Sequence, residues 1–181
     1  MIETQRLILR QWQPEDHGPF AELNADPKVM EFFPSTHPVG ESDALAERNR
    51  DRIEEEGWGL WAVEIRASGE FAGFTGLMSV PFEASFTPAV EVGWRLAHRF
   101  WGQGYAPEAA RAAIDFGFDQ LGLAEIVAMT AEKNLRSRRV MEKLAITYDP
   151  ADDFDHPKIA AGHPIRPHVL YRLRRDASTV S

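Results

Sequence analysis

Residues 89–130 show a strand pattern, a glycine-rich turn, a helix pattern and a second strand pattern, and this order restricts the fold most. AVEVGWRL (89–96) is typical of a strand, and RFWGQGYAPEAAR (99–111) opens a helix whose apolar residues recur at helical spacing. AEIVAMT (124–130) is typical of a second strand. Because parallel strands need a long crossover, usually a helix, we expect one parallel pair here.

The rest of the chain favours antiparallel pairing. Two long strand patterns, at 58–66 and 70–80, are joined by Ala67-Ser68-Gly69, which is a hairpin signal. Further strand patterns lie at 6–10, 146–149 and 168–175. Helix patterns lie at 14–32 (interrupted at Asp26-Pro27), at 42–57, and at 134–144 with Asn134 as N-cap. We therefore predict an α+β layered fold with a mixed, mostly antiparallel sheet of about seven strands and helices on both faces.

Length and composition narrow the class of protein. The 181 residues favour one domain, which we place at 1–175, with a flexible tail at 176–181. No cysteine is present, which excludes disulfides, thiolate metal sites and a cysteine nucleophile. The net charge of −8 argues against nucleic-acid binding. The N-terminus does not have a signal-peptide pattern and no apolar run reaches the ~18 residues of a membrane span, so we expect a cytoplasmic protein.

The turn at 99–106 has the features of an anion site. Glycines at 102 and 104 allow the backbone to approach a ligand closely, and the first N–H groups of the following helix have no partner within the helix. Pro107 is well tolerated in this first turn. The pattern fits a pyrophosphate site, but it equally fits a turn that only lets the helix pack on the sheet.

Two common phosphate-binding motifs are not matched by this turn. A Walker A loop requires a lysine after its last glycine, and none follows Gly104. The dinucleotide fingerprint requires a third glycine at position 107, and that residue is Pro107. A nucleotide-dependent enzyme that uses ATP or NAD is therefore disfavoured.

Four sequence blocks resemble the GNAT N-acetyltransferases, in particular their RimJ/RimL-like branch. Arg99–Ala106 matches the motif [QR]-x-x-G-x-[GA], and TQRLILR resembles the opening T-x-R-L-x-L-R. Glu91-Val92-Gly93-Trp94 resembles the fourth-strand segment E-[IV]-G-[YW]. The segment from Asn134 to Leu144 resembles N-x-x-S-x-x-[VL]-x-E-K-L-G-F, except that Ala145-Ile146 replaces the final Gly-Phe.

The resemblance implies acetyl-CoA as the cosubstrate and a primary amine as the acceptor. In this family the fourth and fifth strands splay apart and the pantetheine arm pairs with the fourth strand. The resemblance assigns that arm to Val92, Gly93, Trp94 and Leu96. It assigns the turn residues to CoA as well, with the amides from Phe100 onward holding the pyrophosphate: Arg99, Phe100, Trp101, Gly102, Gln103, Gly104, Tyr105 and Ala106.

The resemblance also suggests which residues carry the chemistry. A protonated amine needs a base, and Glu91 is the candidate because it lies on the strand facing the thioester in the family arrangement. Ser137 matches the position that donates to the leaving sulfur, and Asn134 one that contacts the pantetheine. The alternatives are an ordinary ion pair for Glu91, an N-cap for Asn134, and a bond from Ser137 back to its own turn. Met141 occupies the position where many other branches carry a tyrosine acid.

Several assignments stay open at this level. Arg136, Arg138 and Arg139 fit either the 3′-phosphate of CoA or a solvated helix face. The acidic loop at 149–167 fits a polar loop that lines the acceptor site better than a metal site, and we predict no metal. A non-catalytic acyl-CoA-binding module is the alternative to an enzyme. The sequence does not identify the amine, and the resemblance is compatible with a homodimer.

Overall fold

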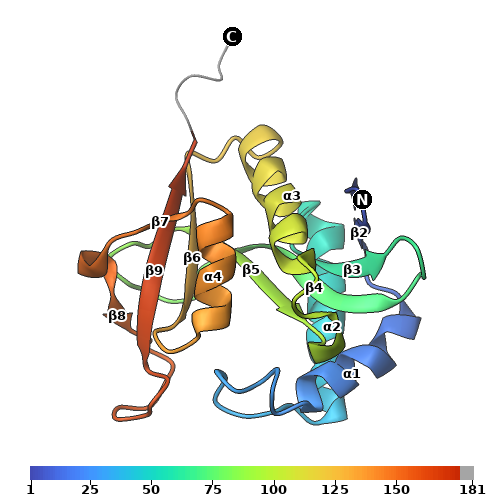
Figure 1. Ribbon diagram of the computed structural model, residues 1–181, viewed down its shortest axis with the longest axis horizontal. Helices are drawn as coiled ribbons and strands as arrows, with labels where there is room; N and C mark the ends of the chain where they lie inside the picture. Colours follow the sequence, from blue (N-terminus) through green and yellow to red (C-terminus); the bar gives the residue numbers. More distant parts are fainter. Residues whose placement is uncertain (176–181) are drawn as a thin grey trace.

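The computed structural model describes residues 1–175, and its central element is one nine-stranded sheet (Figure 1). The order across the sheet is β1-β2-β3-β4-β5-β6-β9-β7, and β8 pairs with β9. The strands are β1 (Ile2–Glu3), β2 (Leu7–Arg10), β3 (Leu60–Ile65), β4 (Phe71–Ser79), β5 (Val90–Leu96), β6 (Glu125–Ala131), β7 (Thr147–Tyr148), β8 (Phe154–Asp155) and β9 (Pro167–Arg174). All of these pairs are antiparallel except β5 with β6.

The predicted mixed sheet and its parallel crossover are confirmed. Each of the seven expected strands is present, and the structure adds β1 and β8. Both additions are two-residue strands, too short to show an alternating pattern. The predicted tail at 176–181 lies outside the described residues, and the assignment of 1–175 to one domain stays a prediction.

Four α-helices accompany the described sheet: α1 (His17–Ala25), α2 (Val39–Glu56), α3 (Tyr105–Asp119) and α4 (Leu135–Lys143). Three short 3₁₀ turns lie at Pro14–Asp16, His98–Phe100 and Pro150–Asp152. Within residues 1–175, none of the helices has the length and apolar character needed to cross a bilayer.

The boundaries of the first two helices follow local backbone rules. α1 ends at the predicted Asp26-Pro27 break, where Asp26 is extended because proline disfavours a helical conformation in the preceding residue. α2 begins three residues earlier than position 42, after the extended Pro38. Ser42 is instead buried inside the helix, where its hydroxyl oxygen accepts a hydrogen bond from Asn24 Nδ2 at 3.2 Å.

Helices pack on both faces of the sheet, as predicted. α3 lies on the face that carries Leu77 and Ile126, so closely that a Cβ added at Gly117 would be 2.8 Å from a methyl carbon of each. On the other face, Phe74 of β4 packs edge-on against Phe20 of α1, with ring centroids 5.9 Å apart. α3 and α4 begin at the same end of the molecule, on either side of β5 (Figure 1).

β5 and β6 separate soon after they begin to pair. Their only registered pair is Glu91 with Val127, although each strand has seven residues. Beyond Glu91, β5 keeps its full ladder with β4 on its other side. The edge of β5 that faces β6 is therefore free of strand pairing over most of its length.

The end of α4 explains the departure at Ala145. The N–H of Ala145 donates to Glu142 O and that of Ile146 to Met141 O, which is the bond pattern of a Schellman C-cap. This cap requires a left-handed residue after the helix, and Ala145 has φ 57°. The left-handed cap position, which favours glycine, is thus occupied here by an alanine, at a conformational cost.

We predict that Ala145→Gly stabilises the protein by about 1 kcal/mol. Glycine relieves the left-handed strain of about 1–2 kcal/mol, and the greater freedom of the unfolded chain offsets part of that gain. Chemical denaturation measures the change. Ala112→Gly, inside α3, is the control and should instead destabilise by about 1 kcal/mol. Destabilisation by both variants would contradict the prediction.

Candidate active site

A cavity of about 690 Å³ opens where β5 and β6 separate. It is lined from β5, the turn before α3, the first turns of α4, the segment after α1 and the loop before β9. Most of the sequence-predicted site residues meet on its wall: Glu91, Val92, Gly93, Trp94, Leu96, Phe100, Trp101, Gly102, Gly104, Tyr105, Ala106, Asn134 and Ser137. The side chains of Arg99 and Gln103 are exposed outside it.

The two faces of β5 divide the cavity into two arms. Side chains alternate along a strand, so Glu91 and Arg95 share a face, and Trp94 lies on the other. Cross-strand partners confirm the first face, because Glu91 is opposite Met78 and Arg95 is opposite Phe74, which packs toward α1. We call the arm on the α3–α4 side the turn arm, and the arm on the α1 side the Glu91 arm.

The turn arm presents a row of free backbone donors. Within residues 1–175, no hydrogen bond engages the backbone N–H groups of residues 102–106. Gly102 and Gly104 have φ of 77° and 80°, the left-handed conformation that directs successive amides inward. Gly104 is also the N-cap of α3, so the helix dipole favours negative charge at the same place. The chemistry of this donor set fits a pyrophosphate.

Thr4 and Arg6 fasten this turn to the N-terminal strands through Glu108. The Glu108 carboxylate accepts hydrogen bonds from Thr4 Oγ1 at 2.6 Å, Arg6 N at 2.9 Å and Arg6 Nε at 2.6 Å. Arg6 Nη1 donates to Gln103 O at 2.9 Å, and its guanidinium lies 4.7 Å from the Tyr105 ring centroid. The conspicuous TQRLILR segment therefore supports the turn rather than touching the cavity.

We predict that Glu108→Ala destabilises the protein by about 1–2 kcal/mol and weakens CoA binding about threefold to tenfold. Burial raises the pKa of Glu108, but hydrogen bonds from Thr4 and Arg6 outweigh it and hold that pKa below its ordinary value. Its contribution is thus complete at neutral pH and is lost as pH falls through the lowered pKa. Glu55→Ala, an exposed change on α2, is the control. Calorimetry that finds CoA affinity unchanged would contradict a role for Glu108 in shaping the turn.

Asn134 and Ser137 lie at the start of α4, facing the turn arm. Asn134 is the predicted N-cap, since its Oδ1 accepts from Ser137 N at 3.2 Å. Its Nδ2 donates to Thr130 Oγ1 at 2.9 Å, which ties the helix to β6. No bond from the Ser137 hydroxyl to another described residue is found, so the hydroxyl is available to the cavity.

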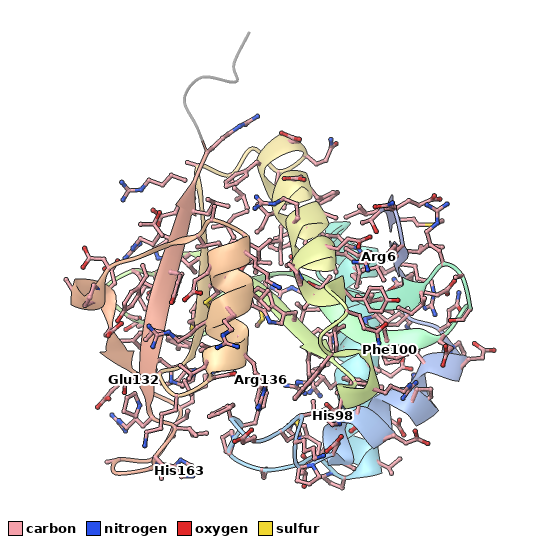
Figure 2. The ribbon with its side chains drawn as sticks, viewed as in Figure 1. Arg6, His98, Phe100, Glu132, Arg136 and His163 are labelled. Atoms are coloured by element: carbon pink, nitrogen blue, oxygen red, sulfur yellow. The ribbon has the colours of Figure 1, made fainter. Side chains whose placement is uncertain are left out.

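The three arginines of α4 have different environments. Arg136 pairs with Glu31 and lies over the Trp101 ring at 4.8 Å, which links α4 to the segment after α1 (Figure 2). Arg138 donates to Tyr171 Oη at 3.2 Å, away from the cavity. Arg139 lines the cavity and has no hydrogen bond or ion pair with the described residues. The positions of these three arginines in the sequence do not show which of them lines the cavity.

Glu91 stands at the junction of the two arms, at the last paired position of β5 and β6. Desolvation raises the pKa of its carboxyl group to about 8, and a backbone hydrogen bond from Met129 only partly opposes this. No arginine or lysine within residues 1–175 forms an ion pair with it. The ion-pair alternative for Glu91 therefore does not apply, and its carboxyl can exchange a proton near neutral pH.

The acidic loop does not bring its carboxylates to the cavity. Asp152 pairs with Arg172, Asp155 pairs with Arg166, and Asp153 accepts from Tyr148 Oη. The loop instead contributes His156, Lys158 and Ile159 to the Glu91 arm, and His168 of β9 joins them. Among residues 1–175, no three His, Asp or Glu side chains are grouped to hold a metal.

The two histidines of this arm are packed among aromatic rings. Their ring centroids are 4.9 Å apart, and Phe154 lies beside both. Burial is the main reason that the pKa of His156 is lowered to about 4 and that of His168 is also lowered. Both rings are therefore uncharged at neutral pH and line the arm as polar, neutral groups.

Comparison with known proteins gives one consistent result. Residues 6–147 match the family model described as acetyltransferase (GNAT) domain. The FsC-acetyl coenzyme A-N(2)-transacetylase of Aspergillus fumigatus is 36% identical over 154 residues, which span 81% of this chain and 65% of that enzyme.

Solved structures agree at the level of the fold. A GNAT-family acetyltransferase from Bacillus anthracis superposes with a TM-score of 0.78 at 22% identity, covering 96% of this chain and 97% of that one. RimL, the ribosomal L7/L12 alpha-N-protein acetyltransferase solved with CoA, has a TM-score of 0.74 at 17% identity, with 96% and 97% coverage.

Proposed function

The chain belongs to the GNAT acetyltransferase family, and on that premise we propose that it acetylates a primary amine by direct attack while acetyl-CoA and the amine are both bound. Acetyl-CoA is the cosubstrate of this family. The observation that carries the proposal is the position of Glu91. An uncompensated carboxyl group with its pKa near neutrality stands where two arms of one cavity meet.

The turn arm is assigned to CoA. The free amides of residues 102–106 hold the pyrophosphate, and the unpaired edge of β5 from Val92 to Leu96 binds the pantetheine arm. Arg139 supplies a cation for a further phosphate. Acetyl-CoA brings a thioester, which is the activated acyl group that the reaction requires.

In the reaction, Glu91 accepts a proton as the amine nitrogen forms its bond to the acetyl carbon. A backbone N–H of β5, that of Trp94, stabilises the charge that develops on the carbonyl oxygen. The carbon–sulfur bond then breaks, and the Ser137 hydroxyl donates a hydrogen bond to the departing thiolate. Met141 also lines the cavity, but its side chain has no proton to donate. Because the CoA thiolate is only modestly basic, it can leave without full protonation, and the hydrogen bond from Ser137 is sufficient to stabilise it.

We predict that Ser137→Ala lowers kcat by about tenfold while the dissociation constant of CoA stays within about twofold. The hydroxyl contributes one hydrogen bond that strengthens as the sulfur becomes negative, so its loss affects the transition state more than the ground state. Single-turnover kinetics and CoA titration measure the two quantities. Equal losses in both would identify Ser137 as a binding residue only.

The proposed function is tested by measuring CoA release from acetyl-CoA with a panel of primary amines, including peptides with free N-termini, polyamines and amino acids. Mass spectrometry of the amine confirms a gain of one acetyl group. In parallel, titrations with CoA, ATP and NAD compare ligand classes. Tight CoA binding without release by any amine would favour the acyl-CoA-binding module, and preference for ATP or NAD would exclude both.

A further inference from the structure

The charges on the cavity wall are opposite in sign to those of the whole chain. The chain has a net charge of −8, yet Glu91 is the single acidic residue among the described residues that line the cavity. Five basic residues line it: Arg95, Arg136, Arg139, Lys143 and Lys158. Because Glu91 is mostly protonated at neutral pH, the cavity carries a clear excess of positive charge.

CoA accounts for only part of that excess. Arg136, Arg139 and Lys143 lie on α4, beside the arm that we assign to the phosphates of CoA. Arg95 and Lys158 lie in the Glu91 arm, on the opposite face of β5. The cations of the Glu91 arm therefore face the acceptor rather than the cosubstrate, an assignment that rests on the proposed function.

Arg95 is half-buried and has no counterion among the described residues. Its Nη1 donates to Asn24 Oδ1 at 2.7 Å, and its Nε is shielded from solvent. Its Nη2 is accessible and has no hydrogen-bond partner within residues 1–175, and no carboxylate among them pairs with the guanidinium. The guanidinium lies 4.1 Å from the Phe33 ring centroid and 5.3 Å from that of Phe74. A half-buried guanidinium without a counterion is costly, and an anion brought by a ligand to the accessible Nη2 would offset that cost.

Arg95 also has a structural role, because it bonds to Asn24, and an experiment must distinguish this role from ligand binding. Asn24 bonds to both Arg95 and Ser42, which links β5 to α1 and α2. That connection uses one guanidinium nitrogen and a neutral amide. A neutral donor of similar length would serve it, so the link to α1 does not by itself require a charge.

We propose that Arg95 binds an anionic group, such as a carboxylate, on the acceptor, so that the substrate is an amine that carries a negative charge. Phe33 and Phe74 pack against the planar guanidinium and fix its orientation, and its accessible Nη2 can donate to a carboxylate. Arg95 follows Glu91 by four residues, a strand distance of about 13 Å. The amine and the anionic group are thus held at two separated points. A polycationic amine would meet Arg95 and Lys158 unfavourably.

The test uses series of amines matched in length that end in a carboxylate, a primary amide or a second amine, from two to six carbons. Binding is titrated with CoA present, and CoA release is measured with acetyl-CoA. For the best length, we expect the wild type to prefer the carboxylate to the amide by about tenfold or more in kcat/KM. Arg95→Gln should abolish the preference, because it should lower kcat/KM for the carboxylate at least tenfold more than kcat/KM for the amide.

Two variants sharpen the result. Arg95→Lys keeps the charge and should retain part of the preference for the carboxylate. Arg139→Gln should raise the KM for acetyl-CoA and leave the preference for the carboxylate unchanged. A wild type that favours the diamine, or that shows no preference at any length, would overturn the proposal. So would Arg95→Gln if it weakened carboxylate and amide equally. If no amine supports CoA release, the proposed function fails, and the binding titration still decides whether Arg95 selects anions.

Discussion

Glu91→Gln is expected to lower kcat/KM by about 10²–10³-fold, the largest activity loss that we predict for a single side chain. Glutamine has the shape of glutamate and can still accept a hydrogen bond from Met129, so the cavity keeps its form. What disappears is the ability to accept a proton from the attacking amine. CoA affinity should therefore be unchanged, and the loss should appear in kcat.

The pH profile separates this role from a structural one. Since only the ionised carboxylate acts as a base, wild-type activity should fall tenfold per pH unit below the raised pKa of about 8 and level off above it. The acceptor for this experiment should be an aryl hydrazine, which stays unprotonated above about pH 6 and adds no titration of its own. The Glu91→Gln profile should be flat, and an unchanged profile would exclude Glu91 as the base.

Stability should change in the opposite direction from activity. Because folding raises the pKa of Glu91, its ionisation is harder in the folded state, and the protein loses stability as pH rises from about 4.5 to 8. Glutamine removes that penalty. We expect the variant to be more stable by about 2 kcal/mol at pH 7, a value reduced to allow for the open side of the cavity. A variant that lost both stability and activity would point to misfolding instead.

The sequence was sufficient to predict the parts of the site that follow from local backbone chemistry. Gly102 and Gly104 before a helix predict free amides whatever the rest of the fold does, and those amides have no partner among the residues that the structure describes. Asn134 predicts its own cap in the same way. The order of strand, helix and strand in 89–130 predicts the parallel pair that separates to form the cavity.

The Glu91 arm could not be predicted, because it is built from contacts between distant segments. Arg95 looks like any exposed strand arginine until Asn24 and Phe33 are placed against it. The loop at 149–167 was misleading for a related reason. Its carboxylates were expected to line the acceptor site, but Asp152 pairs with Arg172 of β9, and Asp155 pairs with Arg166 of the loop itself. The loop therefore presents Lys158, and none of its carboxylates, to the cavity.

The largest stability loss is expected from Gly73→Ala, on the strand behind Arg95. Gly73 has φ 140°, and a Cβ added there would lie 2.1 Å from Arg95 O and 2.8 Å from Leu96 Cα. Neither contact can be relieved by rotating a side chain, because both atoms belong to the backbone of β5. Strain at Gly73 and forced separation of the strands together should cost about 4 kcal/mol.

Gly93→Ala is the matched control for Gly73→Ala, because Gly93 lies on the neighbouring strand and a Cβ added there meets nothing within 4 Å. Denaturant unfolding should show a change below about 1 kcal/mol for Gly93→Ala, although its methyl group enters the Glu91 arm, on the face of Glu91 and Arg95, and should weaken binding of the acceptor. Gly73→Ala should instead show a large loss of stability, and any loss of binding should follow from that loss. Similar stability losses for the two variants would mean that β5 yields to Gly73→Ala, and that the free edge of this strand is less rigidly held than its ladder with β4 implies.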